Sequence, residues 1–376
     1  MQPDGGPSLV IYLPDLHTGG VPRLYLNLVP FFVEAGFSVT LLLDRRAGAL
    51  LESLPANVPV IELGVKRQLL AVPKLRAFLR QHKPALLLSA IEQMNVMAVV
   101  ARALAGTDTR LIVSQHNPLS VQAQRGGLAW KALPVLYRLV VRHADMIVAV
   151  SRGVAQDLVA TASLPSRRVE VIYNGVVGPD FADRRDAEAS LEFVPDGRQA
   201  IINVGRLADQ KDHATLLRAF AMLADPQLYL LLLGEGPSRV ELEALARELG
   251  IAERVLMPGA VSNPLPAIKA ARLFVLSSRY EGFPLVLIES LACGTPVVST
   301  DCPFGPDEVL EGGKYGTLVP VGAPQALADA IAAALAAPVD PVDSIARGEH
   351  FSLERCASRY VNRFRELLVA GSVPSS

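Results

Sequence analysis

The stretch LFVLSSRYEGFPLVLIESLACGTPVVST, residues 273–300, holds two short apolar runs on either side of a helical pattern. The runs 273–277 and 297–299 lack polar alternation, which is typical of strands buried on both faces of a sheet. Pro284 suits the first turn of a helix, where its missing N–H is not needed, and Gly294 is a good helix terminator. Strand, helix and strand in this order predict a βαβ unit with parallel strands.

The same alternation runs through the chain and is interrupted by the polar segment 176–198. We therefore predict an α/β fold of two doubly wound, Rossmann-like domains, 1–180 and 181–350, facing a cleft. A C-terminal helix within 351–376 should pack back toward the first domain. Ligands of such open sheets bind beyond the carboxyl ends of the strands. The other strands are expected at 8–13, 38–43, 85–89, 110–114, 146–150, 200–204, 228–233 and 255–257.

Composition limits the class of protein. Hydrophobic residues make up 51% and charged residues 19%, which indicates a globular chain, and no apolar run approaches the roughly 18 residues that span a bilayer. The N-terminus lacks the pattern of a signal peptide. Three cysteines without a CxxC or Cys/His pattern favour a reduced, cytoplasmic protein without structural zinc.

Two glutamates, Glu281 and Glu289, stand eight positions apart around the predicted helix start. The N–H groups of Leu285 and Val286 at that start favour an anion, whereas carboxylates favour hydroxyl donors. A nucleotide-sugar carries both kinds of group, with sugar and ribose hydroxyls on either side of a diphosphate. The alternative is a charged helix face with nothing bound.

Two cations follow the predicted strand 200–204 in the same domain. Arg206 can fork onto phosphate oxygens and Lys211 can add a point charge, so together they can neutralise a diphosphate. The sequence has no Asp-x-Asp, no His/Cys cluster and no P-loop, so we expect no metal and no cofactor. Alone, the two cations would be ordinary solvated charges. The GEGPSR turn at 234–239 lacks the third glycine of a dinucleotide fingerprint, which argues against NAD.

These motifs resemble the retaining glycosyltransferases of family 4, which have the two-domain GT-B fold. The resemblance is carried by Gly205-Arg206 with Lys211-Asp212, by Gly234-Glu235-Gly236, by EGFP at 281–284 with Glu289, and by GTPVV at 294–298. It covers the second domain strongly and the first mainly through Gly19-Gly20 and His116. The segment TDCPFGPDEVL, 300–310, resembles members that use UDP-sugars to build lipid-linked or surface glycans.

The resemblance implies a role for each matching position. Glu281 would contact the donor sugar and Glu289 the ribose, while Arg206 and Lys211 would bind the diphosphate and stabilise the leaving group. The remaining expected donor contacts are Gly19, Gly20, Gly205, Gly282, Phe283, Pro284, Leu285 and Val286, with His116 near the sugar. Retention in this family is usually explained by front-face attack, which needs no enzyme nucleophile.

Charge is divided unevenly along the chain. Residues 1–175 hold 18 basic and 11 acidic side chains, which leaves 18 basic and 26 acidic for the rest. The segments 65–83 and 127–143 are basic and amphipathic, and the second offers Trp130 and Tyr137 among its apolar residues. The commoner alternative for such segments is a helix packed on its own sheet with basic edges in solvent. The uneven charge nevertheless favours peripheral contact with the anionic inner membrane face and a saccharide acceptor linked to a polyprenyl diphosphate. No nucleic-acid partner is expected.

Three other functions fit parts of the pattern. A nucleotide-sugar epimerase would convert the donor without an acceptor. A non-catalytic sensor would bind the nucleotide-sugar and release no sugar. A glycoside hydrolase needs two carboxylates flanking one bond, whereas here cations accompany them. The sequence does not name the sugar, the acceptor or the linkage.

Overall fold

The computed structural model describes residues 6–17, 19–55, 57–65, 70–125, 127–188, 193–223, 225–337 and 340–370. The chain divides into two compact units. Unit 1 consists of residues 1–175 and 353–376, and unit 2 of residues 176–352, so the expected limits of 180 and 350 lie a few residues away from the observed ones. Because 353–376 adds four basic and two acidic residues to the first 175, unit 1 has a net charge of +9 and unit 2 of −10.

Unit 1 is built on a seven-stranded parallel sheet in the order β3-β2-β1-β4-β5-β6-β7. Strands β4 and β6 are buried along their full length, as continuous apolar runs predict for a sheet covered on both faces. The strands are β1 Ser8–Leu13, β2 Ser38–Leu43, β3 Val60–Glu62, β4 Leu86–Ser89, β5 Arg110–Gln115, β6 Met146–Ala149 and β7 Val169–Val171.

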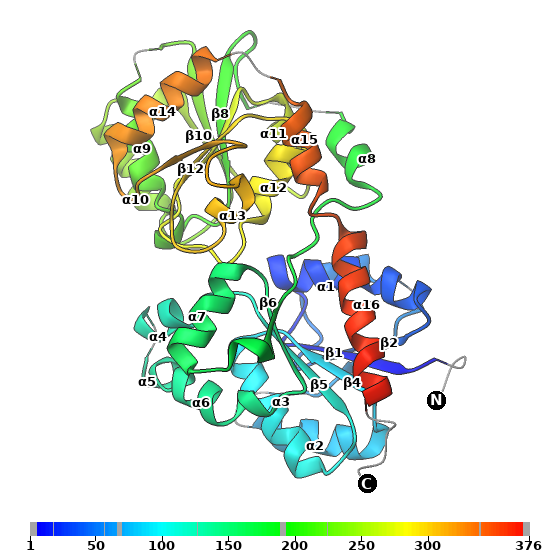
Figure 1. Ribbon diagram of the computed structural model, residues 1–376. Helices are drawn as coiled ribbons and strands as arrows, with labels where there is room; N and C mark the ends of the chain where they lie inside the picture. Colours follow the sequence, from blue (N-terminus) through cyan, green and yellow to red (C-terminus); the bar gives the residue numbers. More distant parts are fainter. Residues whose placement is uncertain are drawn as a thin grey trace. The chain divides into compact units, whose positions relative to one another are not determined.

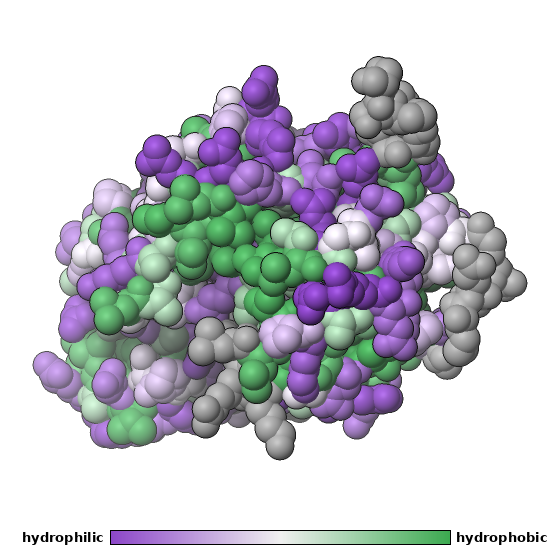
Figure 2. Space-filling model, turned by 90° about the horizontal axis from the view of Figure 1, so that it is seen from below, coloured by the Kyte–Doolittle hydropathy of each residue, from purple (hydrophilic) through white to green (hydrophobic). Residues whose placement is uncertain are grey.

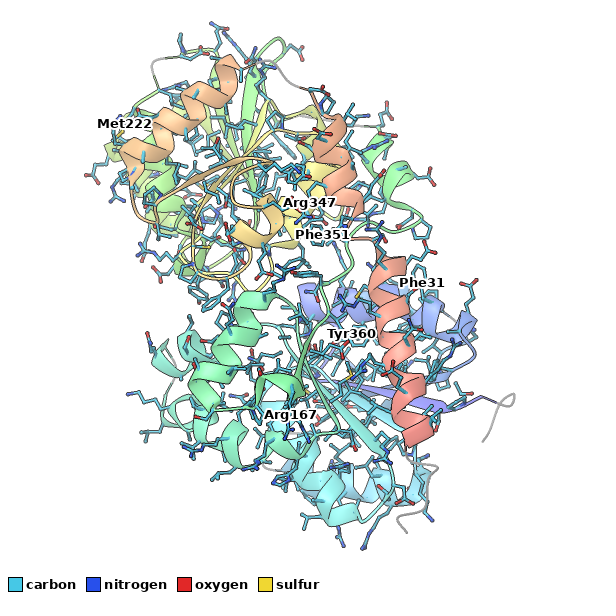
Figure 3. The ribbon with its side chains drawn as sticks, in the orientation of Figure 1. Phe31, Arg167, Met222, Arg347, Phe351 and Tyr360 are labelled. Carbon is cyan, nitrogen blue, oxygen red and sulfur yellow. The ribbon has the colours of Figure 1, made fainter. Side chains whose placement is uncertain are left out.

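Helices cover both faces of this sheet (Figure 1). The helices are α1 Gly20–Glu34, α2 Ala71–His82, α3 Glu92–Ala105, α4 Leu119–Arg125, α5 Leu128–Lys131, α6 Leu133–Leu139, α7 Arg152–Ala162 and α16 Leu353–Ala370. The last helix returns to unit 1 from the far end of the chain, and Figure 3 shows its Tyr360. Tyr360 and Phe364 are buried beside Phe32 of α1. Leu9, Ile11 and other strand residues belong to the same core.

Unit 2 repeats the architecture with a six-stranded parallel sheet in the order β10-β9-β8-β11-β12-β13. Its strands are β8 Gln199–Val204, β9 Leu228–Leu233, β10 Val255–Gly259, β11 Leu273–Leu276, β12 Val297–Thr300 and β13 Thr317–Val319. Its helices are α8 Phe181–Asp186, α9 His213–Ala221, α10 Arg239–Glu248, α11 Leu265–Ala270, α12 Leu285–Ala292, α13 Pro306–Leu310, α14 Pro324–Ala336 and α15 Val342–Glu349. A separate core joins β8, β9 and β11 to α9, α10 and α14.

The predicted doubly wound α/β class is confirmed in both units. Ten strands were predicted within a few residues of their observed bounds, whereas β3, β7 and β13 were missed. These three strands have three residues each and lie at sheet edges, so their hydrophobic pattern is too short to recognise.

The expectation for segment 127–143 was wrong in one respect. It is divided into α5, α6 and the 3₁₀ turn Val141–His143. Pro134 occupies the first turn of α6, where it cannot donate to an extension from α5. Leu133 and Tyr137 are buried, which agrees with the alternative of a segment packed on its own domain. Part of the other basic segment, residues 66–69, lies outside the described residues.

Among the described residues, no helix is both long and apolar enough to cross a bilayer. Cys293, Cys302 and Cys356 are free thiols and all three are buried. Burial raises the pKa of each thiol to about 12, so none of them is a reactive thiolate near neutral pH.

Candidate functional site

Polar loops follow four strands at the carboxyl edge of the unit 2 sheet. Strand β8 leads into Gly205–Asp212, β9 into Gly234–Ser238, β11 into Ser277–Pro284, and β12 into Asp301–Gly305. Strands β9, β8, β11 and β12 are consecutive neighbours in the sheet, so the four loops emerge side by side. This edge is where open α/β sheets bind ligands.

The centre of this edge is an ion pair between Lys211 and Glu281. Lys211 Nζ lies 2.6 Å from Glu281 Oε1, and both side chains are mostly buried. Ser278 Oγ donates to the same oxygen at 2.6 Å. Burying a carboxylate is unfavourable unless it is paired and hydrogen-bonded, and both conditions are met here. The two residues assigned to sugar and diphosphate are therefore in direct contact.

Further hydrogen bonds join the Lys211 loop to the Glu281 loop. Gln210 Nε2 donates to Tyr280 O at 3.1 Å, and the Arg279 backbone N–H donates to Gln210 O at 2.8 Å. The Arg279 guanidinium also lies 3.1 Å from a carboxylate oxygen of Asp212. Backbone and side-chain contacts together hold the loops in one arrangement.

Arg206 is exposed, and it forms no ion pair with any described residue. Next to it, a Cβ on Gly205 would lie 3.3 Å from Lys211 Cε, so the absence of a side chain leaves room for the lysine. Arg206 and Lys211 thus leave the same strand end, as the sequence predicts. One cation is already neutralised by Glu281 and the other is available to a solvent anion.

The start of α12 lies in the Glu281 loop. Pro284 precedes the helix as its N-cap residue rather than standing in its first turn, and Leu285 and Val286 are half-buried at its first two positions. N–H groups at these positions have no partner within the helix and favour an anion. Gly282 and Phe283 are buried, and the Phe283 ring packs against Phe351 with centroids 5.4 Å apart. Glu289 is half-buried further along α12.

The structure explains why glycine is needed at two positions of the GEG turn, which the sequence did not reveal. A Cβ on Gly234 would lie 1.9 Å from Gly205 O, and one on Gly236 would lie 2.2 Å from Leu207 O. The Leu207 N–H donates to Glu235 O at 3.0 Å across the same contact. Close approach of two backbones within the chain is therefore enough to require both glycines.

The backbone conformation of Phe304, in the 300–310 segment, was not predicted from the sequence. Phe304 has a φ of 71°, in the left-handed region that a bulky residue rarely adopts, and Gly305 follows with a φ of 100°. Pro303 O accepts a hydrogen bond from the Glu281 N–H at 3.3 Å, so this loop packs on the Glu281 loop. Strained backbone of this kind is concentrated at functional sites.

Sequence reasoning also missed His213. His213 Nε2 lies 2.9 Å from Asn203 Oδ1, and Asn203 Nδ2 donates to Val275 O at 2.7 Å, which links the residues next to Lys211 to β11. Burial, with a smaller effect of the Lys211 charge, lowers the pKa of His213 to about 4. The signal available in the sequence was only a histidine two residues after the lysine, which is too common to interpret.

His116 belongs to unit 1 and follows β5. Its Nε2 lies 3.1 Å from Ser114 Oγ and 3.3 Å from Tyr25 Oη, and Tyr25 Oη lies 3.3 Å from Tyr360 Oη of α16. Burial lowers the pKa of His116 to about 3, so the imidazole is neutral at pH 7. It can take part in hydrogen bonds there but adds no positive charge.

The predicted glycine pair lies in unit 1 as well. Gly19 is the N-cap residue of α1 and Gly20 begins the helix, and both are exposed. A Cβ on Gly19 would meet the chain only at 3.7 Å or beyond, so internal packing does not require glycine at this position. Whether a ligand requires it stays a prediction.

A group of polar residues near the carboxyl edge of the unit 1 sheet lies around Glu92. Glu92 Oε1 accepts from Asn117 Nδ2 at 3.1 Å, and Tyr137 Oη donates to Gln115 Oε1 at 2.6 Å. Burial raises the pKa of Glu92. Within the described residues, no group of three or more His, Cys, Asp or Glu side chains is placed to hold a metal ion.

The unit 2 edge thus offers two kinds of binding group. Arg206, Lys211 and the start of α12 suit an anion, while Glu281 and Glu289 suit hydroxyl groups.

Two family models match the chain, "Glycosyltransferase Family 4" over residues 18–177 and "Glycosyl transferases group 1" over residues 185–350. A Campylobacter jejuni protein is 32% identical over 84% of this chain and 86% of its own length. The chain belongs to glycosyltransferase family 4.

That relative of the glycosyltransferase is named N-acetylgalactosamine-N,N'-diacetylbacillosaminyl-diphospho-undecaprenol 4-alpha-N-acetylgalactosaminyltransferase. Another relative, from Mycolicibacterium smegmatis, is a GDP-mannose-dependent alpha-(1-6)-phosphatidylinositol monomannoside mannosyltransferase. It is 31% identical over 60% of this chain and 63% of its own. The two relatives differ in the donor and acceptor that their names state.

Solved structures show the same fold. The Anabaena HepE protein in complex with UDP and glucose superposes with a TM-score of 0.79 at 20% identity, covering 96% of this chain and 99% of its own. A Rickettsia africae glycosyltransferase also gives 0.79, at 18% identity, covering 97% and 99%. The glycosyltransferase therefore has the GT-B fold that its motifs predicted.

Proposed function

We propose that this glycosyltransferase moves a hexose or N-acetylhexosamine from a UDP-sugar to a lipid-linked or surface-polysaccharide acceptor, with retention and without a metal ion. The observation that carries the proposal is the Lys211–Glu281 pair at 2.6 Å, with Arg206 on the same loop and the α12 start beside Glu281. A diphosphate with a sugar attached needs cations and a carboxylate within one small region, and this edge provides both.

In the proposed reaction, Arg206 and Lys211 stabilise the charge that develops on the departing diphosphate, and the α12 N–H groups support them. The bond between the anomeric carbon and the phosphate oxygen breaks while the acceptor oxygen bonds to that carbon from the same face. The acceptor proton passes to a phosphate oxygen, so nucleoside diphosphate leaves. Glu281 holds a sugar hydroxyl and Glu289 the ribose, which orients the reacting carbon.

The donor is tested by thermal shift with a panel of UDP- and GDP-sugars. We expect UDP-sugars to raise the melting temperature and GDP-mannose to leave it unchanged. A rise with GDP-mannose and none with UDP-sugars would indicate a donor preference like that of the mycobacterial relative. With the accepted donor, proton NMR of the product reports the anomeric configuration, and turnover should survive EDTA. Donor conversion without an acceptor would instead indicate an epimerase.

The acceptor proposal rests on the Campylobacter relative, whose name states a diphospho-undecaprenol saccharide. An acceptor of this kind lies in a membrane, and unit 1 has a suitable surface. We define the α5–α6 patch by the exposed apolar residues Leu128, Val135 and Leu139, with exposed fractions of 87%, 57% and 59%. The exposed cations Lys131, Arg138 and Arg142 border it. Figure 2, a view from below, shows a patch of hydrophobic residues with hydrophilic residues around it.

Peripheral membrane contact through the α5–α6 patch is tested by sedimentation with vesicles that contain anionic lipid. The native chain should co-sediment at low salt and be released at high salt, because exposed charges are screened. Leu128→Ser with Leu139→Ser should reduce the bound fraction several-fold, because apolar burial drives insertion. Val240→Ser, at a residue 73% exposed on α10 of unit 2, is the matched control. Equal binding by all three chains would contradict the patch.

A further inference from the structure

Two adjacent serines, Ser277 and Ser278, follow β11, and both are fully buried. Ser277 Oγ donates to the backbone oxygen of Lys211 at 2.7 Å. Ser278 Oγ donates to Glu281 Oε1 at 2.6 Å. Ser277 therefore holds the backbone of Lys211, and Ser278 holds the side chain of Glu281.

The Glu281 carboxylate is held through one of its two oxygens. Oε1 receives both Ser278 Oγ and Lys211 Nζ, each at 2.6 Å, while Oε2 receives no side-chain hydrogen bond from the described residues. A carboxylate has lone pairs on both oxygens, so this arrangement leaves Oε2 able to accept from a ligand.

The serine that holds Glu281 is itself held from the neighbouring strand. Thr300 Oγ1, at the end of β12, donates to Ser278 O at 2.6 Å. The Glu281 N–H donates to Pro303 O at 3.3 Å in the loop that follows β12. Both ends of the Ser278–Glu281 segment are thus tied to β12 and its loop, so the hydroxyl that orients the carboxylate cannot shift independently.

We propose that Ser278 is a positioning residue for the donor sugar. By occupying Oε1 together with Lys211, it directs Oε2 of Glu281 toward a sugar hydroxyl, and Ser277 keeps Lys211 in reach of the diphosphate. The inference rests on the proposed function, because it assumes that Glu281 binds the sugar. It assigns Ser278 to recognition of the sugar and not of the nucleotide.

The test compares UDP and the accepted UDP-sugar by isothermal titration calorimetry on native protein and Ser278→Ala. We expect the affinity for the UDP-sugar to fall about tenfold or more, because a hydrogen bond to a charged group is lost, while the affinity for UDP changes less than about twofold. Ser278→Cys keeps a side chain of similar size with a weaker hydrogen-bond donor. If the alanine variant folds poorly, the cysteine variant should likewise lose affinity for the UDP-sugar and not for UDP.

The matched control is Ser299→Ala. Ser299 is also fully buried and lies on β12, but its Oγ donates to Thr300 O and not to the ion pair. It should leave both affinities unchanged. Equal losses for UDP and UDP-sugar in the Ser278 variants would show a merely structural serine, and unchanged sugar affinity would also overturn the proposal. Failure of the native protein to bind either ligand would instead refute the proposed function.

Discussion

At the scale of single residues, the site depends on pairs that are far apart in the chain. Lys211 and Glu281 are separated by 70 positions and lie 2.6 Å apart. The ion pair neutralises one of the two cations assigned to the diphosphate, so a bound donor must compete with Glu281 for Lys211 or share it. Arg206 has no such competitor among the described carboxylates, and it is exposed.

The first prediction concerns these two cations. Arg206→Ala and Lys211→Ala should each lower kcat by about 100-fold or more, because stabilisation of a leaving diphosphate is worth a few kcal/mol. Release of nucleoside diphosphate in the presence of acceptor measures the rate. Arg218→Ala, at an exposed arginine of α9, should keep native turnover. Near-native turnover in both site variants would remove their assigned role.

The second prediction concerns Glu289. If its carboxylate accepts from the ribose, Glu289→Ala should weaken the affinity for UDP and for the UDP-sugar by similar factors of about ten, since both ligands contain the ribose. Calorimetry with the two ligands measures this. A loss restricted to the UDP-sugar would move Glu289 from the ribose to the sugar.

The third prediction concerns His116, whose pKa is lowered from an ordinary 6.5 to about 3 by burial. Between these values the unfolded chain binds a proton that the folded chain does not. The free energy of unfolding is therefore unaffected by His116 above about pH 6.5. Below that pH it decreases as the pH falls, by up to about 1.4 kcal/mol per pH unit. When the free energy of unfolding is measured with urea between about pH 7 and pH 5, it should change less with pH in His116→Asn than in the native protein. Equal slopes would mean that His116 titrates normally.

At the scale of elements, the α2 helix ends with a backbone that its sequence does not favour. Its C-terminal residue is followed by Lys83 with a φ of 44°, in the left-handed region, and Lys83 N–H donates to Leu79 O. Helix α3 of the same unit has glycine at this position, Gly106, whereas α7 has Ser163 with a φ of 52°. The difference matters because a side chain in this conformation costs about 1 kcal/mol.

The fourth prediction follows from this helix end. Lys83→Gly should raise the free energy of unfolding of unit 1 by up to about 1 kcal/mol, because glycine adopts the left-handed conformation without the steric penalty. Lys83→Ala is the control, since it removes the same charge and keeps the penalty. Urea denaturation of both variants checks the difference, and a glycine variant no more stable than the alanine variant would contradict it.

At the scale of the whole molecule, the chain returns to its first unit after completing the second. Helix α16 places Tyr360 and Phe364 in the core of unit 1, and Tyr360 Oη lies 3.3 Å from the Tyr25 Oη that also contacts His116. Each unit has a core of its own. Helix α16 is therefore part of the unit that holds His116, while the proposed donor-binding residues Arg206, Lys211 and Glu281 belong to the other unit.

The fifth prediction tests this division. Phe364→Ala should destabilise unit 1 by about 3–5 kcal/mol, the usual cost of removing a buried aromatic ring, and leave UDP binding at unit 2 unchanged. Val369→Ala, at an exposed residue of the same helix, should do neither. Unfolding curves and calorimetry report the two effects. Loss of UDP binding in proportion to the lost stability would show that the units do not act separately.

Local patterns were enough to predict much of this protein. Apolar runs and turn residues predicted the doubly wound class and most strands, because the period of burial is recorded in neighbouring residues. They also placed Arg206, Lys211 and Glu281 just after strands, and parallel strands bring such positions to one edge of a sheet. The short edge strands were missed because their pattern is too brief to recognise.

Only the tertiary structure decided how those residues meet. That Ser278 and Lys211 share one oxygen of Glu281, that His116 is buried and neutral, and that Tyr137 is covered were not predictable. The glycines at 234 and 236 likewise respond to the backbone at 205–207. Each of these features is a contact between segments far apart in the chain, and a local hydrophobic period contains no record of which distant segment will be the neighbour.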